Sequence, residues 1–379
     1  MVFLGQINLP STELGTPGEE PMISDFVKVF AKMLLIVTVL LTVGLYFLSM
    51  SLQPILMLFT QQGITISSRT VTALPIWFFS KTAYLPLGLN LGVVFLALWA
   101  AITASFVFAW KLKDSFHSVV KNGLVQPTKK LFSSCLFAMP VLNSMMLIAV
   151  LLIQSLQEAG GIPTGSPSIP ANQFEALVDL SYASVIEEVI FRLVPIGAFL
   201  IVYVFWAGKN IATASRTDLV KIFVVAPFFP DKAKQWAGAK TVKENGVFGG
   251  ISINEWGMIA ITAVIFGVAH FNPGVSWELG KITSSGMVGF VLAVIYIVYG
   301  IQASIIMHWF FNAFTDTFII LADLYPATAP IVNIVTVTTY ILGAAGYLLV
   351  AWLGVRKIVN ARKQKQQNQA TSSVPVPLE

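Results

Sequence analysis

Three charged side chains lie inside an almost wholly apolar run, SVIEEVIFRL, at residues 184–193. A charge at the centre of a bilayer costs about 2.5–3.5 kcal/mol on insertion scales, so each charge needs compensation or has a task. Glu188 and Arg192 are four residues apart, with the acid first, which is the favourable order for an ion pair on one helix face. Glu187 points about 100° away from that face. We therefore expect Glu187 to find its partner on another helix.

Only a few polar side chains in the other apolar runs can serve as that partner. His270 closes the segment FGVAHF, and His308 opens HWFFN, where Asn312 follows at i+4 on the same helix face. Taken singly, each histidine could be a buried side chain bonded to a backbone carbonyl or a hydroxyl. Carboxylate, imidazole and amide groups on three spans of so apolar a chain together favour a functional site. The third histidine, His117, lies among lysines and is expected to be a solvated surface residue.

These residue types suit hydrolysis of a peptide bond. The reaction needs a base to activate water and donors for the charge that develops on the carbonyl oxygen. Glu187 is the expected base, and His270 would share the water and carry its proton to the leaving amine. His308 and Asn312, one helical turn apart, would direct their N–H groups at the oxyanion.

A metal mechanism is the alternative, because two histidines and a glutamate form a plausible catalytic zinc set. The HExxH pattern that would make zinc a strong prediction is missing from the sequence. The sequence therefore favours a site without a cofactor. In this interpretation Glu188 and Arg192 hold the helix and bias Glu187 electrostatically.

The ordered set of motifs resembles the type II CAAX prenyl endopeptidases and bacteriocin-processing enzymes, the Rce1-like (CPBP) intramembrane glutamate proteases. The similarity covers about residues 174–320 and rests on Glu187-Glu188-x-x-x-Arg192, Phe266-x-x-x-His270 and His308-x-x-x-Asn312. The resemblance implies a metal-free endopeptidase in which Glu187 and His270 activate water, His308 and Asn312 stabilise the oxyanion, and Phe266 supports the site. It also implies a membrane-anchored peptide or protein substrate, prenylated in the CAAX-type case.

The chain departs from the family pattern at two places. Leu193 follows the motif arginine, where the family usually has glycine, so the helix is expected to pack differently just past the site. The segment between the first and second motifs is also unusually long, because it contains residues 207–256. A non-proteolytic scaffold or sequestering protein that binds a partner through this insertion is therefore the alternative function. A proton-coupled transporter is a third, which the missing repeat of broken helices disfavours.

The elements that must position these side chains are membrane helices. The 379-residue chain is 56% hydrophobic and only 11% charged, against roughly a quarter charged in soluble domains. Several windows exceed the roughly 18 apolar residues that cross a bilayer, and in lipid such runs must be helical. We predict an all-α polytopic membrane protein with about eight transmembrane helices, conical or bundled around an intramembrane cavity. The predicted spans are 29–50, 86–110, 131–154, 174–206, 257–272, 286–301, 303–323 and 333–355, with a turn near Gly300.

The lysines and arginines gather in loops between the apolar runs. This distribution is the positive-inside pattern and not a nucleic-acid footprint, although the net charge is +5. An even number of spans places three basic segments, 111–130, 207–256 and the tail that opens with Arg356, on one side. We therefore predict a multi-pass protein with both termini in the cytoplasm, in the cell membrane if the source is prokaryotic. The expected organisation is a polar segment at 1–28, a membrane domain at 29–356 and a disordered basic and polar tail at 357–379.

Straight vertical helices would not bring the site residues to one depth. Counted at 1.5 Å per residue from the cytoplasmic ends, Glu187 lies about 28 Å, His270 about 20 Å and His308 about 8 Å along its run. We therefore predict that at least one of these helices is broken or strongly tilted. Pro195, inside the long run 174–206, is the candidate break.

Two further features carry weaker predictions. The Asn245-Gly246 dipeptide inside the insertion favours a small β-hairpin. Asp316 continues the stripe of His308 and Asn312 at i+8, so it is either a cavity residue or a cap at a helix end.

Overall fold

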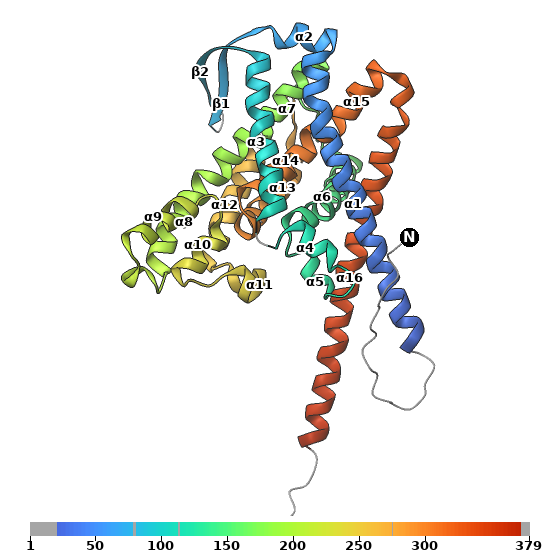
Figure 1. Ribbon diagram of the computed structural model, residues 1–379, viewed down its shortest axis with the longest axis vertical. Coiled ribbons are helices and arrows are strands. Elements are labelled where there is room, and N and C mark those ends of the chain that lie inside the picture. The colour runs from blue at the N-terminus through green and yellow to red at the C-terminus, as the bar shows by residue number, and fades with distance from the viewer. Residues whose placement is uncertain (1–20, 79–80, 113, 275, 373–379) are drawn as a thin grey trace, which may run out of the picture.

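A computed structural model describes residues 21–78, 81–112, 114–274 and 276–372 of the chain (Figure 1). Of the described residues, 79% are helical, which confirms the prediction of an all-α polytopic membrane protein. Within the described ranges, seven helices or continuous helical segments are long and apolar enough to cross a membrane. An eighth span results if the pair of helices at 242–250 and 253–269, bent by 64°, counts as one.

The first half of the chain packs long helices beside a small hairpin. Its elements are α1 (Pro21–Phe59), α2 (Gln61–Ser67), β1 (Thr70–Phe78), β2 (Lys81–Asn90), α3 (Leu91–Lys111), α4 (Phe116–Lys121), α5 (Thr128–Leu131) and α6 (Cys135–Ala159). The antiparallel pair β1–β2 was not predicted, and the span expected to begin at residue 86 begins at Leu91. The predicted span 86–110 had merged the last five residues of β2 with the apolar helix that follows.

The second half carries all three motifs. Its elements are α7 (Gln173–Glu188), η1 (Val189–Leu193), α8 (Pro195–Ala207), η2 (Ile211–Thr213), α9 (Arg216–Val225), α10 (Pro230–Ala237), α11 (Val242–Gly250), α12 (Ile253–Ala269), α13 (Leu279–Tyr299), α14 (Ile301–Trp309), η3 (Phe310–Phe314), α15 (Thr315–Leu324), η4 (Pro326–Thr328) and α16 (Pro330–Ser372). The predicted turn at Gly300 is confirmed, since this residue has a φ of 104° and separates α13 from α14.

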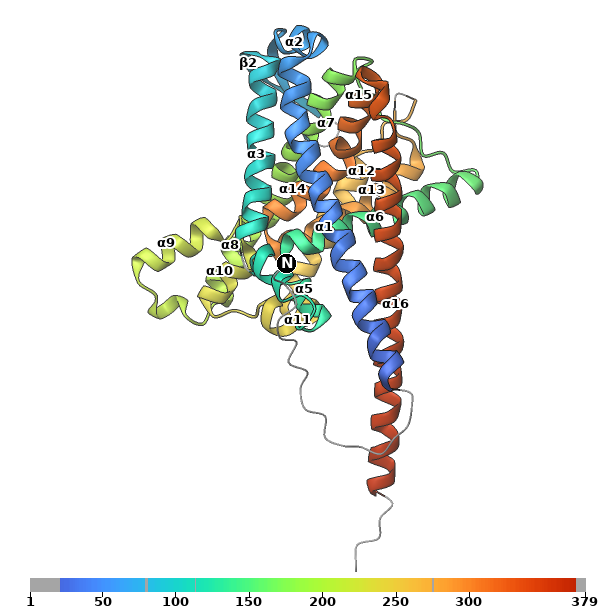
Figure 2. The ribbon, with the colours of Figure 1, turned by 45° about the vertical axis from the view of Figure 1, so that its right-hand side comes forward.

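Two of the motif-bearing helices are interrupted next to the motif residues. A π-helical turn, η1, joins α7 to α8 directly before Pro195, and a second, η3, joins α14 to α15. Both segments nevertheless remain continuous, at 173–207 and 301–324, so the predicted break takes the form of a local change in helical pitch. Outside the motif-bearing helices, the C-terminal half of α6 projects sideways in Figure 2, at a steep angle to α1 and α16.

The basic segments gather at one end of the molecule. In Figure 1 the start of α1, the short helices α4 and α5, the helices α9–α11 and the end of α16 lie in the lower part of the view. The helix α2 and the β1–β2 hairpin lie at the opposite end. The basic segments therefore lie on one side of the molecule. We propose that this side faces the cytoplasm.

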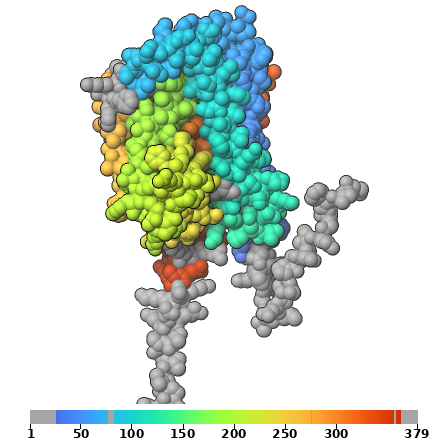
Figure 3. Space-filling view, turned by 60° about the vertical axis from the view of Figure 1, so that its left-hand side comes forward, coloured from blue at the N-terminus to red at the C-terminus, as the bar shows by residue number. Residues whose placement is uncertain are grey.

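The insertion 207–256 is folded rather than an open loop. It contains η2, α9, α10 and α11, and it forms a rounded mass, coloured yellow-green, on the face shown in Figure 3. Lys234 of α10 is fully buried and pairs with Glu255 of α12 at 2.9 Å. The hairpin predicted at Asn245-Gly246 is wrong. These residues lie inside α11, where the φ of 70° at Gly246 produces a kink and not a turn between strands.

The two ends of the chain differ from the expected organisation where they are described. Residues 21–28, predicted as part of a polar segment, already form the start of α1. Helix α16 continues to Ser372, well past residue 357, where the disordered tail was expected to begin. The rest of both predicted segments, 1–20 and 373–379, lies outside the described residues.

The core surrounds α14. Every residue from Gln302 to Trp309 is buried, so this helix lies in the interior and not on the lipid face. The Trp309 ring packs edge-on against Tyr46 of α1 and Phe106 of α3, with centroid distances of 5.7 Å and 5.3 Å. This packing fixes the helix that carries His308.

Candidate active site

The predicted ion pair of the first motif forms at the junction of α7 and η1. Arg192 Nη1 donates to Glu188 Oε1 at 3.1 Å, and both side chains are buried. The second amino group of Arg192, Nη2, donates to the carbonyl of Gly289 on α13 at 3.3 Å. The guanidinium carbon lies 4.2 Å from the centroid of the Phe266 ring on α12. The pair therefore links three helices.

His308 reaches both glutamates from α14. Its Nδ1 lies 2.7 Å from Glu188 Oε1, and its Nε2 lies 3.7 Å from Glu187 Oε2. Because Glu188 already accepts from Arg192, its carboxylate is ionised and His308 Nδ1 acts as the donor. The ring nitrogen that faces Glu187 is therefore Nε2.

His270 completes the cluster from the C-terminal end of α12. Its Nδ1 lies 2.7 Å from the carbonyl oxygen of Phe266, one turn earlier, and its Nε2 lies 3.8 Å from Glu187 Oε2. A carbonyl can only accept, so Nδ1 carries the proton and the Nε2 of a neutral ring presents its lone pair. Phe266 also packs on the His270 ring at a centroid distance of 4.5 Å.

Asn312 does not join this group. It lies in η3, and its Nδ2 donates to the carbonyl of Leu180 on α7 at 3.4 Å. The sequence prediction assumed that His308 and Asn312 share one face at α-helical spacing. The wider π turn between Trp309 and Thr315 changes that spacing, so the amide lies against α7 instead. Asp316, in α15 beyond this turn, is half-buried.

The site is partly open. The side chains of Glu187 and His270 are 17% and 21% exposed, whereas that of His308 is 8% exposed. Among the described residues, Glu187 Oε2 has no hydrogen-bond partner. A gap of 3.7–3.8 Å to each imidazole is too long for a direct hydrogen bond and is suited to a bridging water molecule.

The possible metal ligands are the same three side chains. In the described part of the chain, no group of three or more His, Cys, Asp or Glu side chains has an arrangement that could hold a metal ion. Glu187, His270 and His308 are nevertheless the residues that a zinc mechanism would have to use.

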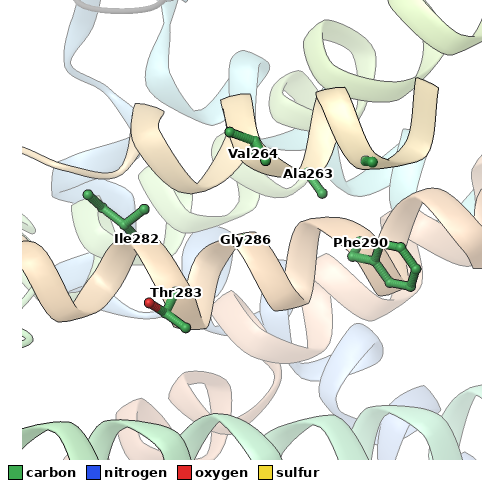
Figure 4. A pocket seen from close by; sticks show the side chains of 7 residues that line it. Ala263, Val264, Ile282, Thr283, Gly286 and Phe290 are labelled. Carbon is green, nitrogen blue, oxygen red and sulfur yellow. The ribbon is translucent and has the colours of Figure 1, made fainter. Parts of the chain in front are cut away.

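An apolar pocket lies between α12 and α13 (Figure 4). Its lining consists of Ala260, Ala263, Val264, Ile282, Thr283, Gly286 and Phe290. None of the predicted site residues lines it. The helices touch at its floor, because a Cβ on Gly267 would lie 2.5 Å from the Ile282 carbonyl oxygen.

Sequence reasoning missed two residues that shape the site. Gly289 accepts from Arg192, and a Cβ there would lie 2.9 Å from the Phe266 ring. Lys281 of α13 is close enough for its charge to act on Glu187 and on His270. In the sequence, these two residues are visible only as a glycine inside a helical run and a lysine at the start of one. Both features are common in helices that form no site, so neither indicated a functional residue.

The molecule is thus a polytopic helical membrane protein with a carboxylate–histidine site assembled from α7, α12 and α14. Residues 171–314 match the model of the Rce1-like family, the type II CAAX prenyl endopeptidases, so the chain carries an Rce1-like segment and the predicted resemblance is confirmed. All the predicted site residues lie inside the matched segment. No curated protein and no solved structure matches the chain.

Proposed function

We propose that the protein is an intramembrane endopeptidase that hydrolyses a peptide bond in a membrane-associated substrate, prenylated in the CAAX-type case. One observation carries the proposal: Glu187 Oε2, without a hydrogen-bond partner among the described residues, faces the Nε2 atoms of His270 and His308. A carboxylate and two imidazoles from three helices can bind one water and the carbonyl that it attacks. The match to a family of CAAX-type proteases supports this reaction class.

The proton assignments support a division of labour between the two histidines. Glu187 takes a proton from water, and the hydroxide adds to the carbonyl carbon. Glu187 then passes this proton to the Nε2 lone pair of His270, and His270 passes it on to the leaving nitrogen as the C–N bond breaks. The new carboxylic acid gives its own proton to the released amine. The products are a carboxylate and a protonated amine. Glu187 and His270 thus act as a base and a proton carrier.

His308 is the proposed oxyanion donor. With Nδ1 hydrogen-bonded to Glu188, its Nε2 can donate only when the ring is an imidazolium. The carboxylates of Glu187 and Glu188, the Arg192 guanidinium and a His308 imidazolium have a net charge of zero. A buried group of charges costs the least free energy when its net charge is zero. Asn312 already donates one of its two N–H groups to Leu180, so we assign the larger share to His308.

Glutamine substitutions at the two proton-handling residues test the proposal. Glu187→Gln and His270→Gln should each lower the cleavage rate of a farnesylated fluorogenic CAAX peptide about 10²–10⁴-fold, because each removes proton transfer. Matched controls are Glu175→Gln, which alters a partly exposed ion pair with Arg69, and His117→Gln at an exposed position. Both controls should cleave at the rate of the unsubstituted protein. Folded Glu187→Gln protein with undiminished cleavage would refute the proposal.

Zinc is the competing cofactor assignment, and it makes a different prediction. A site without metal keeps its activity after dialysis against a chelator and shows no stoichiometric zinc by elemental analysis. Activity that disappears with the chelator and returns with zinc would transfer Glu187, His270 and His308 to a metal-ligand role.

The alternative of a scaffold that acts through the insertion 207–256 has one structural observation in its favour. Helix α9 exposes three apolar side chains, Val220, Phe223 and Val224, each more than half accessible. Replacing all three with serine separates the two functions. An endopeptidase keeps its cleavage rate, whereas a scaffold loses its partner, detected by co-purification, while the motif residues remain intact.

A further inference from the structure

Helix α9 of the insertion has one buried face and one exposed apolar face. Ile222 is 2% exposed and packs in a cluster with Val204 of α8 and Ala237 of α10. Three apolar side chains on another side of the helix are more than half exposed: Val220 (62%), Phe223 (53%) and Val224 (53%). Because they are spaced at i, i+3 and i+4, they form one stripe along α9. This apolar stripe therefore points away from the protein.

The apolar stripe follows closely on the lipid-facing surface of the preceding span. Helix α8 is the second half of the candidate span Gln173–Ala207, and its last turns expose Val202 and Trp206 by 69% and 77%. A tryptophan near the end of a span is typical of the boundary between membrane and water. Only residues 208–215 separate the end of α8 from the start of α9. Helix α9 therefore begins close to that boundary.

The height of α9 in the molecule agrees with this placement. Helix α3 has 21 residues and is about 31 Å long, which is close to the roughly 30 Å thickness of the hydrocarbon core. Its two ends therefore mark the two boundaries of that core. In both Figure 1 and Figure 2, α9 lies near the height of the lower end of α3, where that helix leads into α4. Helix α9 thus lies beside the membrane surface and not far out in water.

The charges around the apolar stripe complement phospholipid headgroups. Lys209, Arg216 and Lys221 are exposed in and just before α9. The acid among them is Asp218, which pairs with Lys221 at 3.3 Å, so three cations stand against one carboxylate. Phosphate groups lie directly above the acyl chains, and an apolar face bordered by cations is typical of helices that lie in this layer. Phospholipid therefore fits both the apolar and the charged side chains of α9.

We propose that α9 is an interfacial helix that holds the insertion 207–256 against the bilayer. Its apolar stripe enters the boundary between headgroups and acyl chains, and Arg216 and Lys221 lie at the phosphate groups. The proposal assigns lipid to the same side chains that a scaffold would offer to a protein. It does not depend on the proposed endopeptidase function, because its test measures the position of α9 and not cleavage.

A fluorescent label on each side of α9 tests the inference in the full-length protein. The one cysteine of the chain, Cys135, is 2% exposed, so an NBD maleimide labels an introduced cysteine and the unsubstituted protein measures the background. Phe223→Cys puts the label on the apolar stripe. Lys221→Cys is the matched control, because its side chain is 59% exposed and lies about 160° around the helix from position 223.

The labelled proteins are placed in phosphatidylcholine vesicles with or without bromine atoms on the upper acyl chains. Bromine should quench the label at position 223 at least about threefold more strongly than the label at position 221, because only the former lies among acyl chains. Iodide in the water should show the opposite order. Equal quenching of the two labels by bromine overturns the inference. A label at position 223 that neither bromine nor iodide reaches also overturns it, in favour of contact with a second copy of this chain.

Trypsin provides a second measurement that needs no label. It cleaves after Arg216 and Lys221 in α9 and after Lys240, which is exposed between α10 and α11. In vesicles, replacing all three residues of the apolar stripe with serine should raise the rate of cleavage after Lys221, relative to that after Lys240, by about tenfold, because α9 then loses its support from lipid. An unchanged ratio of the two rates overturns the inference.

Discussion

Two buried ion pairs of this apolar protein contrast with each other. In the insertion, Lys234 Nζ donates to both oxygens of Glu255 and to the carbonyl of Gly250. The second Glu255 oxygen also accepts from the N–H of Ser252. In the membrane site, Glu188 Oε2, Arg192 Nε and Glu187 Oε2 all lack a hydrogen-bond partner among the described residues.

The difference separates a structural ion pair from a functional one. A buried polar group without a partner costs about 1–3 kcal/mol, and more when it is charged, so a structural pair is expected to use all its atoms. The Lys234–Glu255 pair does so, and it fastens α10 to the first turn of α12. The Glu188–Arg192 pair and the neighbouring Glu187 leave three polar atoms without a hydrogen bond among the described residues, as a site that must bind water and substrate requires.

The largest expected effect on stability comes from breaking the satisfied pair. Lys234→Met keeps most of the side-chain volume and leaves Glu255 charged and buried without its cation. The free energy of unfolding should fall by about 3–5 kcal/mol. The melting midpoint in detergent micelles measures this loss, and the cleavage rate per folded molecule should be unchanged.

A double substitution serves as the control for that loss. In Lys234→Met/Glu255→Met both charges are gone, so most of the lost stability should return. If Lys234→Met melts at the temperature of the unsubstituted protein, the pair does not fasten the insertion and the contrast between the two sites loses its structural half.

A middle-sized effect is expected at Gly289, where α13 packs against the Phe266 side chain of α12. A Cβ there would lie 2.9–3.2 Å from three atoms of Phe266, whose ring touches both Arg192 and His270. Gly289→Ala should cost about 1–3 kcal/mol of stability through overpacking and should lower kcat by about 10-fold or more through displacement of the ring. Melting and cleavage are measured on the same preparation.

Gly257→Ala is the matched control for this substitution. Gly257 lies on α12, and a Cβ there would have no atom within 4 Å. Its replacement should leave cleavage unchanged and raise helix stability slightly. An equal effect of the two alanines on cleavage would show that Phe266 does not transmit the change.

The charged residues explain how much of the site could be predicted. A charge in a lipid-facing run is costly, so the types and spacings of Glu187, Glu188 and Arg192 already required an ion pair and a distant partner. The structure confirms the pair at 3.1 Å and brings His270 and His308 to Glu187. These outcomes could be predicted because the free-energy cost of an unpaired charge in the membrane is large. Small variations of helix geometry do not remove that cost.

The features that were not predicted depend on small energies. A π turn differs from an α turn by one residue and has no sequence signature, so the displacement of Asn312 toward Leu180 could not be anticipated. The strands β1 and β2 were not predicted, and the last five residues of β2 were assigned to the span that follows. The kink at Gly246 was mistaken for a turn. Lys281 is informative only through its position near Glu187 and His270, which the sequence does not contain.

A smaller effect is expected at the start of α12, where the satisfied pair meets a helix cap. Ser252 Oγ accepts from the N–H of Glu255, and the Glu255 carboxylate accepts from the N–H of Ser252, so the two form a capping box. Ser252→Ala removes the first bond and should cost about 1 kcal/mol. Ser215→Ala, at the N-cap of the exposed helix α9, is the comparison. A loss several times larger in Ser252→Ala would mean that the cap and the Lys234–Glu255 pair are coupled.

The smallest change in stability is expected at Glu187, where the largest loss of turnover is predicted. Its Oε2 makes no hydrogen bond among the described residues, and its side chain remains 17% exposed. Glu187→Gln keeps the shape and removes a charge whose Oε2 atom no hydrogen bond stabilises, so the free energy of unfolding should change by no more than about 0.5 kcal/mol. Its melting midpoint is compared with that of Glu255→Gln, which weakens the pair with Lys234 and should melt well below the unsubstituted protein. A Glu187→Gln protein that melts as low as Glu255→Gln would instead show that Glu187 is a structural charge. A carboxylate that stabilises the fold this strongly must already be paired, whereas a catalytic base must be free to bind water.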